Sequence, residues 1–318
     1  MKICNFLKDG APRLGAVGDG VVTDLAMASG NAPEFADIAA FIEAGRGAID
    51  HARRLVVDAP AAARLDMSTV RFSVPLMPST VLCAGSNYHA HNAEKLNTPL
   101  SGQEPEFFLK TSDCVIGPDE GIICDPALTQ KLDAETELAI VIGKPGRHIP
   151  VSQALDYVFG YTVSNDVTAR DKQVRRTPEG FTWYELGRGK AFDSSLPLGP
   201  VIMTADEIPD PQALTLRTRI NGELRQNAST ADMIWTCAEL IHFFSISFTL
   251  KPGMVILTGT PAGTAWSMDK ELGGNWSPAE GLIAATRYCL PGDVIESEIV
   301  EIGILRNPIV APGQAATM

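Results

Sequence analysis

The chain has 318 residues, of which 45% are hydrophobic and 20% charged, and its formal net charge is −12 at pH 7. These values are typical of a folded globular protein and exclude a disordered or fibrous chain. The negative charge, without a dense run of Lys or Arg to offset it, argues against nucleic acid as a partner. A small anionic substrate is still compatible with it, because a bound divalent cation and a few nearby basic side chains outweigh distant, screened charge.

The six cysteines form no CxxC pair, and four of them lie within apolar runs, so we interpret them as buried thiols. No segment of about 18 apolar residues occurs, which argues against a membrane-spanning helix and a membrane partner. Residues 1–10 lack the apolar core of a signal peptide. We therefore expect a reducing, cytoplasmic location.

Residues 1–72 are expected to form a small N-terminal α/β domain. Its first part contains short β-prone runs separated by Gly-containing turns, at 3–7, 13–17 and 21–25. Apolar residues at three- and four-residue steps then predict two helices, over 33–44 and 48–65.

Residues 73–318 are expected to form the main, strand-dominated domain. Short β-prone segments, bounded by Pro and Gly, are predicted at 80–84, 106–110, 121–124, 135–142, 157–164, 200–203, 215–220, 254–258 and 294–300. Few long helices intervene apart from one predicted over about 229–244. The pattern indicates an α+β fold whose main domain is a barrel or sandwich with mixed sheets.

Two carboxylates open the apolar strand predicted at 135–142. Positions i and i+2 of a strand face the same side, so Glu135 and Glu137 are expected to project together. A divalent cation between them would offset their repulsion, and oxygen ligands favour Mg²⁺, Mn²⁺ or Ca²⁺ over zinc. The alternative is a solvated strand end, because such pairs are common on exposed faces.

Two further groups of polar residues each allow a structural and a functional interpretation. Asp166 follows the apolar segment 157–164 and is either a turn former or helix N-cap, or a third acidic ligand beside the glutamates. His91 and Glu94 would share a face of a short helix starting after Tyr88, with His89 pointing elsewhere. They then form either a hydrogen-bonded acid–base pair or a surface pair of little energetic value.

These segments, in this order, resemble the fumarylacetoacetate hydrolase family over about residues 78–310. The matching motifs lie at 85–94, 105–110, 116–118, 135–143, 160–171, 189–193, 198–200, 252–263 and 291–293. The resemblance implies a mixed β-roll or barrel core, usually dimeric, with a variable N-terminal domain. The chain departs from the family at Ser86, where Leu is common, at Thr111, where Pro is common, and in the unusual segments 174–188 and 264–290.

Carried over residue by residue, the resemblance implies that Glu135, Glu137 and Asp166 bind the metal, Mg²⁺ or Mn²⁺, with Ca²⁺ as a third candidate. It implies that His91 and Glu94 activate water on a lid. It also implies that Lys190 is the active-site cation, although from spacing alone Lys190 could be a surface lysine, and Lys110 ranks second. The residues implied to line the pocket for a small keto acid are Tyr88, Arg170, Gln173, Gly259 and Thr260.

The activity implied by this resemblance is metal-dependent hydrolysis of a C–C bond in a 2,4-dioxo acid, such as an acylpyruvate or fumarylpyruvate, by a homodimer. The alternative is a decarboxylase or isomerase of a keto diacid of the oxaloacetate or 2-hydroxyhepta-2,4-dienedioate type, because both reactions need an enolate stabilised beside a cation. A binding protein that has lost catalysis is disfavoured, since the three acids and the His–Glu pair are all present.

Overall fold

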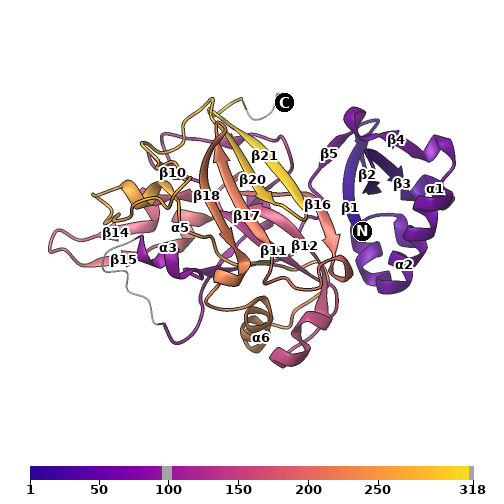
Figure 1. The fold of residues 1–318 in the computed structure, drawn as a ribbon, viewed down its shortest axis with the longest axis horizontal. Helices are drawn as coiled ribbons and strands as arrows, with labels where there is room; N and C mark the ends of the chain where they lie inside the picture. Colours follow the sequence, from indigo (N-terminus) through magenta and orange to yellow (C-terminus); the bar gives the residue numbers. More distant parts are fainter. Residues whose placement is uncertain (95–101, 315–318) are drawn as a thin grey trace.

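The computed structural model describes residues 1–94 and 102–314, within which the largest element is a sheet of twelve strands (Figure 1). Ten of them follow one path, in the order β4 (Arg64–Asp66), β3 (Val21–Asp24), β2 (Ala11–Gly18), β1 (Lys2–Lys8), β16 (Leu196–Thr204), β12 (Val158–Asn165), β11 (Thr136–Ile142), β19 (Val255–Leu257), β6 (Val81–Gly85) and β7 (Glu106–Lys110). The other two lie off this path, β5 (Arg71–Ser73) beside β1 and β8 (Val115–Ile116) beside β16. The sheet is mixed, because β6 pairs parallel with β19 and β8 parallel with β16.

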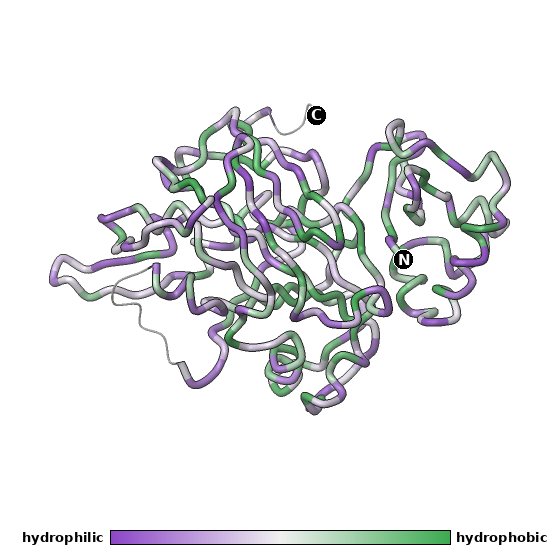
Figure 2. Tube along the Cα trace, viewed as in Figure 1, coloured by the Kyte–Doolittle hydropathy of each residue, from purple (hydrophilic) through white to green (hydrophobic). Residues whose placement is uncertain are grey.

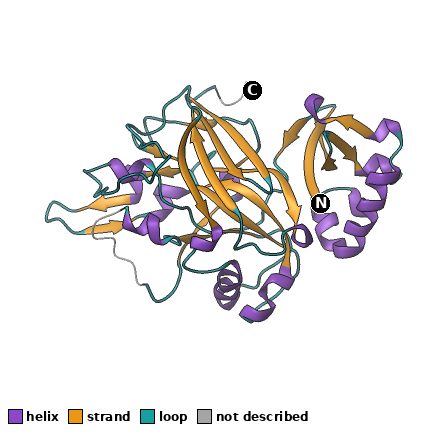
Figure 3. Ribbon diagram, viewed as in Figure 1, coloured by secondary structure: helices purple, strands orange, loops and turns teal. Residues whose placement is uncertain are grey.

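A second sheet of five strands is described, in the order β18 (Glu223–Ser229), β17 (Thr215–Ile220), β20 (Val294–Ile299), β21 (Gly303–Val310) and β9 (Ile122–Ile123). Two small antiparallel pairs complete the strands, β10 (Leu132–Asp133) with β13 (Thr168–Ala169), and β14 (Val174–Arg176) with β15 (Thr182–Tyr184). Both long sheets end in edge strands, so neither closes into a barrel in the described residues. The expected α+β, sheet-dominated fold is confirmed, without barrel closure (Figure 3).

The helices of the described residues are mostly short. The α-helices are α1 (Leu25–Ala28), α2 (Ile38–Asp58), α3 (His89–Ala93), α4 (Arg170–Gln173), α5 (Leu186–Lys190) and α6 (Cys237–Ser247). Single 3-10 turns occur at Pro33–Phe35, Ala61–Ala63, Met67–Thr69, Ser112–Cys114, Ala205–Glu207, Thr230–Asp232 and Ala265–Met268, and a longer one at Val151–Tyr157. None of these helices is both long and apolar enough to cross a bilayer.

Three helix boundaries differ from the sequence-based expectation. The helix expected over about 229–244 begins at Cys237, because Thr236 and Glu239 form a reciprocal capping box there. The first helix expected in the N-terminal part starts at Ile38, where the Asp37 side chain accepts from the Ala40 amide. It continues through a non-helical Gly45 to Asp58, and Ala59, the residue before Pro60, has a non-helical ψ of 133°.

The N-terminal strands extend the main sheet. Figure 1 shows the first 70 residues gathered on one side of the molecule, yet β1 pairs with β16, through Lys2 with Met203 and Ile3 with Ile202. The division at residue 72 stays a prediction, and it falls inside β5, which also pairs with β1.

Alternate residues of β11 face two different hydrophobic cores. Leu138, Ile140 and Ile142 pack in the core shared with the five-stranded sheet and α6, whereas Ala139 and Val141 belong to the core on the opposite face. Figure 2 shows hydrophobic segments running through the middle of the larger part of the molecule. By the same alternation, the side chains at 135 and 137 lie on the Ala139 face, away from the five-stranded sheet. The six cysteines are buried thiols, as expected.

Candidate metal and substrate site

The ends of four strands meet at one edge of the twelve-stranded sheet. Strand β11 runs antiparallel to β12 and β19, and β6 runs parallel to β19. The start of β11 therefore lies beside the carboxyl ends of the other three strands. The residues directly after those ends are Asp166, Thr258 and Ser86. Strand ends are where loops can present functional side chains on a rigid support.

Glu135, Glu137 and Asp166 converge at this edge. All three side chains are buried, and one carboxylate oxygen from each lies within 4.8 Å of the others. The sequence-based expectation that these acids come together therefore matches the geometry. Three carboxylates fit a divalent ion such as Mg²⁺, Mn²⁺ or Ca²⁺, because these hard cations take oxygen ligands.

Basic side chains surround two of these acids. The Lys190 ammonium lies 2.5 Å from Glu135 Oε2 and 2.5 Å from Asp166 Oδ2, and Arg170 Nη2 lies 2.5 Å from Glu135 Oε1. Burial raises the pKa of Glu135, but the charges of Arg170 and Lys190 outweigh it and hold that pKa well below its ordinary value. Glu135 is therefore ionised without a bound metal ion.

Glu137 is in a different electrostatic position. In the described residues it forms no ion pair, and its Oε2 accepts a hydrogen bond of 2.8 Å from the Gly259 amide. Burial, reinforced by the nearby charges of Asp166 and Glu135, raises the pKa of Glu137 well above its ordinary value. Without a metal, the cluster therefore favours the protonated form of this carboxyl, and a cation bound there would compete with that proton.

We expect binding of Mn²⁺ to the metal-free protein to release a proton at pH values below the raised pKa of Glu137. Because the raised pKa keeps Glu137 protonated below it, and the ligand must be deprotonated, the apparent affinity should increase as the pH rises towards that pKa. Calorimetric titrations in buffers of different ionisation enthalpy measure the proton count. An affinity independent of pH, with no proton released, would contradict the assignment of Glu137.

The two candidate lysines have different surroundings. Lys190 lines the cavity beside the acids, whereas Lys110 is not among the described residues that line it. The Lys110 ammonium lies 2.9 Å from Asp166 Oδ1 and donates to the backbone carbonyls of Lys190 and, at 2.8 Å, of Ser195. Lys110 therefore fixes the end of α5 and orients Asp166, which leaves Lys190 as the lysine that can meet a substrate.

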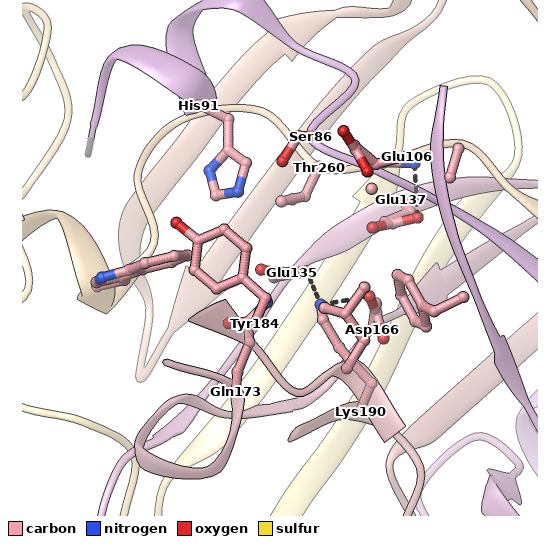
Figure 4. A pocket seen from close by; sticks show the side chains of 16 residues that line it. Ser86, His91, Glu106, Glu135, Glu137, Asp166, Gln173, Tyr184, Lys190 and Thr260 are labelled. Atoms are coloured by element: carbon pink, nitrogen blue, oxygen red, sulfur yellow. Dashed lines mark hydrogen bonds and ion pairs between the residues drawn. The ribbon is translucent and has the colours of Figure 1, made fainter. Parts of the chain in front are cut away.

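His91 and Glu94 form a buried pair on α3, which begins after Tyr88 as expected. His91 Nδ1 lies 2.6 Å from Glu94 Oε2. Glu94 also accepts from the Gly263 amide at 2.6 Å and from the Thr264 hydroxyl at 3.2 Å. A carboxylate on Nδ1 favours the tautomer with the lone pair on Nε2. Figure 4 shows the His91 ring at the wall of the cavity that the acids line.

The cavity combines this polar centre with aromatic and polar walls. Its other lining side chains include Phe108, Tyr184, Trp266, Ser86, Glu106 and Gln173. Trp266 and Tyr184 come from the two segments, 264–290 and 174–188, where we expect, from the sequence, a departure from the resemblance. Both segments therefore form walls of the pocket, next to the three acids.

Three of the five residues expected to bind substrate, Gln173, Gly259 and Thr260, line this cavity. The other two are not among its described lining residues. Tyr88 belongs to the hydrophobic core and lines a neighbouring hollow with Met233.

Arg170 lies behind Glu135. Its Nε donates to Asp133 at 2.8 Å and its Nη1 to Gln173 at 2.9 Å, and its guanidinium stacks 5.0 Å from the Trp266 ring centroid. The Asp133 carboxylate, which the sequence did not single out, also accepts from the Trp266 amide at 3.1 Å. Arg170 and Asp133 thereby position Glu135 and two pocket walls, Gln173 and Trp266, rather than facing the cavity.

Comparison with known proteins decides the family. Residues 80–310 match the family model described as fumarylacetoacetate (FAA) hydrolase C-terminal. The chain belongs to the fumarylacetoacetate hydrolase family. The human mitochondrial protein named oxaloacetate tautomerase FAHD2A is 37% identical over 272 residues, 85% of this chain and 78% of its own length.

Two solved structures extend the comparison along nearly the whole chain. The fumarylacetoacetate hydrolase of psychrophilic Exiguobacterium antarcticum is 35% identical with a TM-score of 0.76, over 98% of this chain and 99% of that one. The maleylpyruvate hydrolase of Sphingobium sp. SYK-6, solved with manganese(II) and pyruvate, is 26% identical with a TM-score of 0.74, over 98% and 99%. Members of the fumarylacetoacetate hydrolase family thus include hydrolases and tautomerases of small keto acids.

Proposed function

We propose that this family member is a divalent-metal-dependent hydrolase that cleaves a C–C bond of a 2,4-dioxo acid. The products would be a pyruvate-type acid and a carboxylic acid. The observation that carries the proposal is that His91, held by the buried Glu94, lines the same cavity as Glu135, Glu137 and Asp166. A candidate base for water and a candidate site for a cation thus line one cavity.

The chain's own residues supply the remaining parts of the reaction. A divalent ion held by the three carboxylates would polarise the keto oxygens of the substrate. His91 Nε2 takes a proton from water, whose oxygen attacks the C4 carbonyl carbon. The C3–C4 bond then breaks, and its electron pair stays on C3 as the enolate of the pyruvate-type product, which is completed when C3 takes up the proton that His91 holds. The Lys190 ammonium places a fixed positive charge beside this developing negative charge.

The proposal also includes the substrate, the metal ion, the oligomeric state and the cellular location of the protein. The substrate is a small anionic keto acid, and the ion is Mg²⁺ or Mn²⁺, which the manganese bound to the Sphingobium relative supports. A homodimer and a cytoplasmic location stay predictions.

A second function is tautomerisation or decarboxylation of a keto diacid. The name of the human relative, oxaloacetate tautomerase, favours it. The same acids and Lys190 would stabilise an enolate in that reaction, and no water would attack. In that reaction, His91 would transfer a proton between a carbon and an oxygen atom of the substrate.

An isotope experiment separates the two functions. The protein is incubated with acetylpyruvate in H₂¹⁸O, with Mn²⁺ and in parallel with a chelator. Hydrolysis predicts equal amounts of pyruvate and acetate, with one ¹⁸O in the acetate carboxylate, and no reaction with the chelator. Enol–keto conversion of oxaloacetate, or release of carbon dioxide from it, without any cleavage of acylpyruvates would overturn the hydrolase proposal.

A further inference from the structure

The loop at residues 259–263 contacts both halves of the candidate site. At its start, the Gly259 amide donates to Glu137 Oε2 at 2.8 Å. At its end, the Gly263 amide donates to Glu94 Oε1 at 2.6 Å. The position of this loop therefore affects both a candidate metal ligand and the carboxylate that holds the candidate base.

A buried side chain outside the loop holds the middle of it. Gln226 belongs to β18 of the five-stranded sheet and is 1% exposed. Its Nε2 donates to the Thr260 hydroxyl at 3.0 Å and to the Pro261 carbonyl at 2.7 Å. Its Oε1 accepts from the Thr136 amide at 3.3 Å and from the Thr218 hydroxyl. The Gln226 side chain thereby joins the loop to the start of β11, between the two glutamates of the acidic cluster.

The hydrogen-bond partners fix the orientation of this carboxamide. The Pro261 carbonyl can only accept a hydrogen bond and the Thr136 amide can only donate one, so exchanging the oxygen and nitrogen of Gln226 would lose both bonds. The Thr260 hydroxyl, which Gln226 contacts, donates in turn to the Thr136 carbonyl at 2.9 Å. A side chain without both a donor and an acceptor would therefore remove the connection between the loop and β11.

The residue before Gln226 supports the end of the same loop. The backbone of Arg225 approaches Gly263 so closely that a Cβ at Gly263 would lie 2.0 Å from the Arg225 carbonyl oxygen. Gly263 also has a φ of +114°, a conformation that favours glycine. Two consecutive residues of β18 thus contact the middle and the end of the loop, the first through its backbone and the second through its side chain.

We propose that Gln226 is a positioning residue that holds the loop at 259–263 where its two glycine amides reach Glu137 and Glu94. Gln226 is not among the described residues that line the cavity, so it acts through the loop and not by touching a metal or a substrate. The role rests on the proposed function, because Glu137 is a ligand only if the acidic cluster binds a divalent ion.

The test replaces Gln226 with Met, which has a similar length but neither a strong donor nor a strong acceptor. We expect the affinity of Gln226→Met for Mn²⁺ to fall by about 10–100-fold, as it does when an outer hydrogen-bond partner of a metal site is removed. Hydrogen exchange of the metal-free protein, followed by mass spectrometry, should show the loop amides exchanging at least about 10-fold faster than in the parent.

The matched control is Gln212→Met. Gln212 makes the same kind of connection, because its Nε2 donates to the Thr230 carbonyl and its Oε1 accepts from the Cys237 amide, both at 2.8 Å. It is not among the described residues that line the cavity. Its replacement should leave Mn²⁺ affinity and the exchange of the loop amides at the parent values, even if it lowers the unfolding temperature as much as Gln226→Met does.

Mn²⁺ affinity equal to that of the parent in Gln226→Met, whatever the exchange rate, would overturn the positioning role. Gln226→Asn keeps the amide but is too short to reach both the loop and β11, so it should show the same losses and replaces Gln226→Met if that variant does not fold. A parent that binds no Mn²⁺ would overturn the metal site and this role with it. Weaker Mn²⁺ binding by Gln226→Met, with no cleavage of acylpyruvates by the parent, would overturn the hydrolase and support the role of Gln226.

Discussion

The variant Glu137→Gln is expected to fold as stably as the parent and to lose tight binding of Mn²⁺. The raised pKa of Glu137 favours its neutral form in the metal-free protein, and glutamine is neutral and has nearly the same size. The glutamine carbonyl can still accept from the Gly259 amide. Mn²⁺ affinity should fall by more than about 10–100-fold, which is the usual loss when a residue that only contacts a metal ligand is removed. The value of kcat/KM should fall by at least about 100-fold.

Isothermal titration with Mn²⁺ and thermal unfolding of the metal-free protein measure the two effects separately. Glu280→Gln is the control, because Glu280 is exposed and is distant in sequence from Glu135, Glu137 and Asp166. Parent-like affinity for Mn²⁺ in Glu137→Gln would remove this side chain from the metal site. A large loss of stability in the metal-free variant would instead show that the folded protein needs the charge of Glu137.

The second large effect is expected for His91→Asn, which removes the base but not the metal ligands. Its kcat for cleavage of an acylpyruvate should fall by about 10²–10⁴-fold, the usual contribution of general acid–base catalysis. Mn²⁺ affinity should stay at the parent value, because His91 is not part of the acidic cluster. Steady-state kinetics at saturating Mn²⁺ and a parallel titration provide both numbers.

The control for this variant lies on the same helix. His89→Asn changes an exposed histidine of α3 that does not line the cavity of the acids among the residues described, so both kcat and Mn²⁺ affinity should be those of the parent. A His91→Asn enzyme with undiminished kcat would rule out His91 as the base. A joint loss of activity and Mn²⁺ binding would show that His91 supports the acidic cluster instead.

The sequence predicted those features that depend on short-range periodicity. The two-residue repeat of a strand places Glu135 and Glu137 on one face, and the structure keeps that alternation along β11. The three-residue spacing of His91 and Glu94 on a short helix allowed a hydrogen-bonded pair or a surface pair, and the structure shows the hydrogen bond. Both patterns are local, so packing elsewhere in the chain did not alter them.

The sequence did not predict which side chains form the cavity walls, because these come from loops whose direction depends on tertiary contacts. Trp266 reaches the site because its amide donates to Asp133, more than 130 positions earlier. Arg170 belongs to a matching motif, yet the same Asp133 turns it behind Glu135. For Glu106 a signal existed, since it stands at i−4 from Lys110 on a predicted strand, and alternation places both on one face.

The most direct test of the metal site is anomalous diffraction from crystals of the parent protein grown with Mn²⁺. The account predicts one strong peak with carboxylate oxygens of Glu135, Glu137 and Asp166 around it, at about 2.0–2.6 Å, the range for hard divalent ions on oxygen ligands. A peak bound by other residues, or no peak at a Mn²⁺ concentration that supports full activity, would contradict it.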